Sequence, residues 1–114
     1  MVTEVTYLYN AVVTSIYDGD TIRVNIDLGF NFWKMNETIR LSGIDAPELR
    51  GIERPLGLKS KEWLEKKIPI GSKIIIQTEK DKQEKYGRYL GTIWMDGVNI
   101  NLQMMEEKFA IPYE

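Results

Sequence analysis

Short segments in which apolar and polar residues alternate, each ended by a turn that contains glycine or proline, constrain the fold of this chain most. Ile22, Val24 and Ile26 alternate with polar residues, which is the period of a strand with one buried face. Further strands are expected at 7–17, 37–44, 73–78 and 88–95, helices at 56–67 and 99–108, and loops at 28–36 and 79–85. Five strands left as an open sheet would expose unpaired edges. The pattern therefore predicts an α+β, mainly β fold in which a closed five-stranded barrel carries two helices.

The length and the first residues bear on domain organisation and location. A chain of 114 residues is short for two domains, so we expect a single domain over 1–114. Residues 1–13 contain Glu4 and no long apolar run, so neither a signal peptide nor a membrane span is expected. The chain as written is expected in the cytoplasm, or outside the cell if a leader has been removed. We expect a monomer with no membrane partner.

The composition excludes several kinds of site. The sequence contains no histidine and no cysteine, which removes Ser-His-Asp and Cys-His triads, thiolate or imidazole zinc sites, and disulfides. Catalysis would use carboxylates, lysine, arginine, tyrosine or hydroxyls, with a hard cation that prefers oxygen ligands. The formal net charge of −2 does not predict bulk attraction to nucleic acid, although the segment 50–88 carries 11 basic and 6 acidic residues.

Three short motifs combine carboxylates, arginines and tyrosines. They are Asp18-Gly19-Asp20-Thr21 at a hairpin turn, Arg40-Leu41-Ser42-Gly43-Ile44-Asp45-Ala46-Pro47-Glu48 at the end of a strand, and Tyr86-Gly87-Arg88-Tyr89 at the start of another. Taken singly, the first motif is most often only a turn, and the charges of the other two most often face solvent. Their combination and order along one chain indicate a shared site.

The three motifs are followed by an Asp-Gly turn and a helix that opens with asparagine, and together they resemble the staphylococcal nuclease family over about residues 7–113. The resemblance implies an OB-fold barrel with helices packed against it. It also implies a calcium-dependent nuclease that hydrolyses phosphodiester bonds of DNA and RNA with little sequence specificity, cutting the bond to the 5′ oxygen and leaving 3′ phosphates. The chain resembles a short member of the family that lacks the C-terminal helix.

Two carboxylates and one main-chain carbonyl match the calcium ligands of the family. Position by position they are Asp20, Asp45 and the carbonyl of Ala46. Alanine stands there where the best-known member has threonine, and a main-chain ligand tolerates that change. Such a set of hard oxygens leaves places on calcium for water and for a phosphate oxygen. Asp18, the other carboxylate of the turn, is expected to hold the turn through its side chain.

The remaining matches concern the phosphate and the nucleotide. Arg40 and Arg88 match the two arginines that contact the scissile phosphate, and Glu48 matches the catalytic glutamate. Tyr86 and, more loosely, Tyr113 match tyrosines that contact the nucleotide. Hydrolysis of a phosphodiester requires that growing phosphate charge is neutralised and that a proton is taken from water. Guanidiniums and a glutamate suit these two tasks in a chain without histidine.

A non-catalytic OB-fold domain that binds single-stranded nucleic acid is the alternative function. Such a domain uses aromatic platforms and a basic groove, and it has no need for the full set of carboxylates and arginines. Cleavage in the presence of calcium distinguishes the two functions. Trp33 and the phenylalanines of 28–37 are expected to cover one end of the barrel rather than to stack on bases.

Overall fold

The computed structural model describes residues 7–113. Its elements follow one another in this order: β1 (Leu8–Asp18), β2 (Thr21–Gly29), β3 (Phe32–Leu41), β4 (Ile44–Asp45), a 3₁₀ turn η1 (Gly51–Glu53), α1 (Arg54–Lys67), β5 (Lys73–Gln83), β6 (Tyr89–Met95), β7 (Val98–Asn99), α2 (Ile100–Glu106) and β8 (Ile111–Pro112). The longer helix, α1, has 14 residues. In the part of the chain that is described, neither helix has the length and apolar character needed to cross a membrane.

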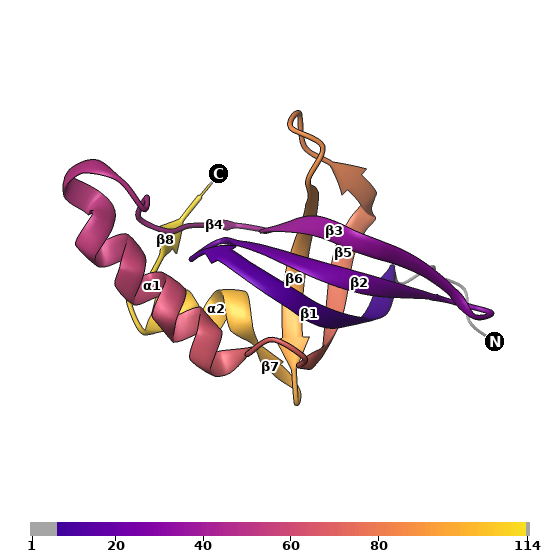
Figure 1. The fold of residues 1–114 in the computed structure, drawn as a ribbon. Coiled ribbons are helices and arrows are strands. Elements are labelled where there is room, and N and C mark those ends of the chain that lie inside the picture. The colour runs from indigo at the N-terminus through magenta and orange to yellow at the C-terminus, as the bar shows by residue number, and fades with distance from the viewer. Residues whose placement is uncertain (1–6, 114) are drawn as a thin grey trace.

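Five of the strands close into a barrel (Figure 1). The antiparallel order β3-β2-β1-β5-β6 is closed by a parallel seam between β3 and β6, in which Ile39 pairs with Tyr89 and Leu41 with Gly91. A Cβ on Gly91 would lie 2.9 Å from a methyl group of Ile76 and 3.1 Å from one of Ile39, so the seam needs glycine where it crosses the core. The predicted OB-fold barrel with two helices is confirmed.

Apolar side chains from the inner strand faces and from both helices form one core. Ile22, Ile39 and Ile93 of the barrel are fully buried, and Leu64 of α1 and Met104 of α2 join them. Burial of each such side chain contributes about 1.5–3 kcal/mol to folding. Helix α1 packs against β1 and α2 packs against β6, so the helices hold the barrel end where the carboxylate motifs lie.

Asn101 of α2 links the helix to the strands near that end. Its side-chain oxygen accepts from the Ile93 N–H at 3.0 Å, and its amide nitrogen donates to the carbonyls of Ser42 at 2.9 Å and Gly91 at 3.1 Å. Three hydrogen bonds satisfy this buried amide. The turn that follows Arg40 is therefore fixed to the seam and to α2.

Two segments expected to be loops are largely continuous with strands. β2 runs to Gly29 and β3 begins at Phe32, so residues 28–36 form the end of a hairpin that projects from the barrel (Figure 1). Phe30 is 95% exposed, Phe32 69% and Trp33 48%. The expectation that these aromatic residues cover a barrel end is wrong. β5 likewise continues to Gln83, through residues expected to form a loop.

Candidate active site

The turn between β1 and β2 is packed tightly against the rest of the site. Gly19 is buried, and a Cβ there would lie 2.7 Å from the Cβ of Ala46 and 2.8 Å from that of Ser60, so only glycine allows this approach. The Asp20 N–H donates to Asp18 Oδ1 at 3.0 Å, the contact with which an aspartate holds a turn. Burial and the neighbouring Asp20 carboxylate raise the pKa of Asp18 to about 6.

Asp20 is a carboxylate that is only 7% exposed, and the second motif already contacts it. Its Oδ2 accepts from the Ala46 N–H at 2.9 Å and lies 3.5 Å from Nη2 of Arg40. Its Oδ1 accepts from the Thr21 hydroxyl at 3.2 Å. A charge at this depth is tolerated because it is both paired and hydrogen-bonded.

Both terminal nitrogens of the Arg40 guanidinium contact oxygen atoms of the protein. Nη1 donates to the carbonyls of Leu41 and Ile44, each at 2.9 Å. Nη2 lies between two carboxylates, 3.5 Å from Asp20 and 3.4 Å from Asp45. These four contacts fix the orientation of the Arg40 guanidinium without a ligand. A guanidinium that is already oriented favours recognition of a phosphate.

The structure brings together the three residues that the sequence predicts as metal ligands. Asp20 and Asp45 share Arg40, and Ala46 contacts Asp20 through its N–H. The donors are hard oxygens, and the Asp45 side chain is 48% exposed, which leaves access for water. Over residues 7–113, no three carboxylates gather closely enough to hold an ion by themselves. The residues fit calcium if a backbone carbonyl and water complete the shell, and ligation stays a prediction.

Arg88, just before β6, is held by a glutamate that the sequence analysis missed. Glu84 accepts from Arg88 Nε at 3.1 Å and from Nη2 at 3.0 Å, and its Oε1 also accepts from the N–H groups of Tyr86 and Arg88. Glu84 raises the pKa of Arg88, and Asp20 and Asp18 add to this effect. Arg88 lies two residues before Leu90, which pairs with Arg40 across the seam between β3 and β6.

Replacing Glu84 with glutamine should weaken the pH dependence of stability in acid. Hydrogen bonds from Arg88 lower the pKa of Glu84 from 4.5 to about 2. A carboxylate whose pKa is lowered by folding stabilises the fold above its unfolded pKa, and this stabilisation is lost as the pH falls through the folded value. Between pH 4.5 and 2, the wild type should therefore lose stability that Glu84→Gln already lacks at neutral pH. Urea unfolding across this window measures the difference, and equal slopes for the two proteins would contradict the pairing.

Glu48 pairs with an arginine that lies outside the three motifs. Its Oε2 accepts from Arg50 Nε at 3.0 Å, in an ion pair whose side chains are 60% and 85% exposed. Its backbone is nevertheless fixed, because a Cβ on Gly57 of α1 would overlap the Glu48 carbonyl. Glu48 and Asp18 line one shallow hollow on the surface. Since an exposed ion pair contributes little energy, Glu48 can exchange Arg50 for another partner.

Both candidate nucleotide tyrosines lie beside an arginine. The ring centroid of Tyr113 is 5.4 Å from Cζ of Arg40, and that of Tyr86 is 5.8 Å from Cζ of Arg88. The Tyr113 N–H donates to the Gly43 carbonyl at 3.0 Å, which ties the end of the chain to the turn after Arg40. Tyr113 is 60% exposed and Tyr86 73%, so both rings are accessible, and their contact with a nucleotide stays a prediction.

The fold and the site together define a class of protein, an OB-fold barrel that carries two arginines paired with carboxylates. Comparison with known sequences identifies the class more narrowly, because the sequence model of the family described as staphylococcal nuclease homologue matches residues 38–114. The match covers more than half of the chain. The chain belongs to the staphylococcal nuclease homologue family.

Individual relatives are distant. The chain is similar to an uncharacterised protein of Methanocaldococcus jannaschii, with 30% identity over 92% of this chain and 58% of that protein. It is similar to the thermonuclease of Staphylococcus intermedius, with 26% identity over 86% of this chain and 56% of that protein. A probable staphylococcal-like nuclease of Oryza sativa subsp. japonica is 39% identical over 66% of this chain and 21% of that protein. The chain spans little more than half the length of the first two relatives.

Proposed function

We propose that this chain is a calcium-dependent phosphodiesterase that hydrolyses DNA and RNA with little sequence selectivity. The observation that carries the proposal is Arg40, whose guanidinium is fixed by two backbone carbonyls and stands between the carboxylates of Asp20 and Asp45. The charge of Arg88 interacts with Asp20 as well. A phosphate bound by both arginines would therefore lie next to oxygens that can hold a metal ion.

The carboxylates of Asp20 and Asp45 and the carbonyl of Ala46 would hold calcium in this proposal. Bound calcium would supply positive charge beside the phosphate and lower the cost of charge that grows on its oxygens. Arg40 and Arg88 bind and orient the same phosphate with donors that cannot lose their charge. Each close arginine–phosphate pair contributes up to about 4 kcal/mol before desolvation, at an effective dielectric constant near 20.

Glu48 acts as the base in the proposed reaction. It leaves Arg50 and takes a proton from a water molecule, whose oxygen forms a bond to phosphorus. The bond between phosphorus and the 5′ oxygen breaks, and the 5′ oxygen takes a proton from solvent. The products are a 3′ phosphate and a 5′ hydroxyl.

Low sequence selectivity follows from which parts of the substrate the site would contact. Contacts with phosphate and sugar carry no sequence information. The exposed rings of Tyr86 and Tyr113 can stack on any base, since every base offers an aromatic face. DNA and RNA are therefore both expected as substrates.

The deciding assay incubates single-stranded DNA, duplex DNA and RNA with the wild-type protein in calcium, in magnesium and in chelator. All three substrates should be cut in calcium, with 3′ phosphate ends, and none in chelator. Ends that carry 5′ phosphates, or undiminished cleavage in chelator, would count against the proposal. Binding without cleavage at high protein concentration would favour the non-catalytic single-strand-binding alternative.

A nucleotide with 5′ and 3′ phosphates should stabilise the protein strongly only together with calcium, because its negative charge would meet Arg40 and Arg88 beside the carboxylates of Asp20 and Asp45. A ligand that binds only the native state adds about 2.7 kcal/mol at a hundredfold excess over Kd. Since 1 kcal/mol shifts Tm by roughly 4–8 °C for a domain of about this size, the expected rise in Tm is about 10–20 °C. Thermal melts with calcium, with nucleotide, with both and with neither measure the coupling. Additive shifts, or no shift in any combination, would argue against a shared site.

A further inference from the structure

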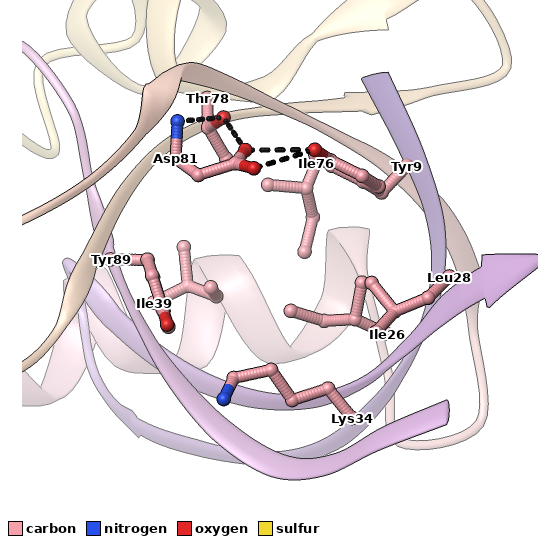
Figure 2. A pocket seen from close by; sticks show the side chains of 9 residues that line it. All are labelled: Tyr9, Ile26, Leu28, Lys34, Ile39, Ile76, Thr78, Asp81 and Tyr89. Atoms are coloured by element: carbon pink, nitrogen blue, oxygen red, sulfur yellow. Dashed lines mark hydrogen bonds between the residues drawn. The ribbon is translucent and has the colours of Figure 1, made fainter. Parts of the chain in front are cut away.

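A second hollow lies at a mouth of the barrel, and the proposed mechanism does not use it. Side chains from β1, β2, β3, β5 and β6 surround a small opening of about 80 Å³ that is continuous with solvent (Figure 2). Ile26, Ile39 and Ile76 form its apolar floor, and the polar groups gather on its rim. An apolar floor with a few fixed polar groups above it is the typical composition of a small-ligand site.

One side of the rim presents a fixed carboxylate. Asp81 accepts from the Tyr9 hydroxyl at 2.9 Å on Oδ1 and 2.8 Å on Oδ2, and Thr78 donates to Oδ1 at 2.7 Å. Lys80 and Asp81 both have φ of 55°, in the left-handed region that such residues rarely adopt. Backbone strain of this kind persists where surrounding contacts hold it, and it is common at ligand sites. The strained segment of β5 therefore holds an acceptor above the apolar floor.

The opposite side of the rim presents a cation. Lys34 of β3 faces Asp81 across the opening (Figure 2). Its Nζ lies 5.8 Å from the ring centroid of Tyr89 and 3.2 Å from Glu37. The mouth thus combines an acceptor-only group, a donor-only group and an apolar floor between them.

The chemistry of the mouth selects among ligand classes. An aliphatic ligand would remove the charges of Asp81 and Lys34 from water without offering either of them a further hydrogen bond, which is costly. An anion would face Asp81, and a cation would face Lys34. A neutral, planar ring with N–H donors on one edge and carbonyl or ring-nitrogen acceptors on another satisfies both groups and rests its apolar faces on the isoleucines. Every nucleobase has these properties.

The mouth adjoins the proposed phosphate site through the seam of the barrel. Ile39 and Tyr89, which line the mouth, pair with each other, and they are the sequence neighbours of Arg40 and Arg88. Because side chains alternate along a strand, Ile39 faces the mouth while Arg40 faces the carboxylates outside. We propose that the mouth binds a base of the substrate strand near the nucleotide whose phosphate meets the arginines, an inference that rests on the proposed nuclease function.

A first experiment measures base binding without phosphate or cleavage. Cytidine, ribose and toluene are titrated into the full chain, and the methyl NMR signals of Ile39 and Ile76 are followed. Cytidine should shift these signals with and without calcium, ribose should not, and toluene should bind more weakly. Asp81→Asn and Lys34→Met should each weaken cytidine binding about tenfold, whereas Lys59→Met, on the exposed face of α1, should leave it unchanged.

Asp81→Asn should keep the fold, because asparagine tolerates a left-handed backbone and its carbonyl oxygen can still accept from Tyr9. Burial, together with Asp81, raises the pKa of Tyr9 to about 12. This pKa should fall in the variant, because asparagine carries no negative charge beside the Tyr9 hydroxyl. Cytidine shifts confined to other signals, or equal affinity in wild type and variant, would overturn the proposal.

A second experiment tests whether the mouth binds a base of the substrate during cleavage. Short oligonucleotides with a single cleavable linkage are compared with copies that lack one base at successive positions. On the intact substrate, Asp81→Asn should raise KM about tenfold with kcat unchanged, and at one abasic position wild type and variant should have the same KM. Equal losses at every position would overturn the base site. If the wild type cuts no substrate, the nuclease proposal fails, and the cytidine titration still decides whether the mouth binds a base.

Discussion

Glu48→Gln is expected to lower kcat by about 10²–10⁴ while calcium and nucleotide affinities change little. Glutamine has nearly the same shape as glutamate, but it cannot take a proton from water. The ion pair with Arg50 is exposed and contributes little to stability, so the free energy of unfolding should stay within about 0.5 kcal/mol of the wild type. Initial rates on single-stranded DNA in saturating calcium, and urea unfolding, measure the two quantities.

Glu62→Gln is the matched control for Glu48→Gln, because it changes another exposed glutamate, on α1, by the same chemistry. It should keep the wild-type rate. If Glu48→Gln also turned over at the wild-type rate, the proton of the attacking water would be taken by another group. If both variants lost activity equally, the loss would reflect net charge and not the position of Glu48.

The centre of the candidate site was predictable because it depends on local pattern and on strand pairing. Alternation of apolar residues indicated β2, and the Asp-Gly turn joined it to β1. Thr21 and Arg40 pair across β2 and β3, so Asp20 and Arg40 are neighbours once the two strands are in register. Asp45 and Ala46 follow Arg40 by only a few residues, and Asp20 contacts Ala46 directly. The motifs that carry the family resemblance therefore lie where strand pairing brings their residues together.

The hairpin end at residues 28–36 was mistaken for a loop because its period is irregular. Gly29 and Asn31 indicated a turn, and the aromatic residues between and after them break the alternation. The strands there are paired through partners such as Asp27 with Trp33, beside shifts in register. Register shifts of this kind depend on the opposite strand. The pattern of one strand taken alone does not reveal them.

The sequence also does not reveal which residues contact the site residues and hold them in place. Glu84 reaches Arg88 because a tight turn brings them together, with the Gly87 N–H bonded to the Glu84 carbonyl at 2.9 Å. Gly57 approaches the backbone of Glu48 because α1 packs over that segment. Both contacts form only in the folded chain. The residues next to Glu84 and Gly57 in the sequence do not distinguish them from the other glutamates and glycines.

Arg40→Lys and Arg40→Met should separate catalysis from stability at the centre of the site. Lysine keeps a charge near Asp20, but a single ammonium cannot hold two backbone carbonyls and bind a phosphate as a fork. Arg40→Lys should therefore lose about 10² or more in kcat with a modest loss of stability. Turnover near that of the wild type in Arg40→Lys would place the phosphate site elsewhere.

Arg40→Met should in addition destabilise the fold by about 3 kcal/mol. The side chains of Arg40 and Asp20 are only 12% and 10% exposed, so the variant leaves a buried carboxylate unpaired. Arg40→Met combined with Asp20→Asn should regain part of the loss, because the unpaired charge is gone. Urea unfolding measures each value, and Arg23→Met, at an exposed position of β2, should change it by less than about 0.5 kcal/mol. If the double variant lost the sum of the two single losses, Arg40 and Asp20 would not be coupled, and the carboxylate would be held by its hydrogen bonds alone.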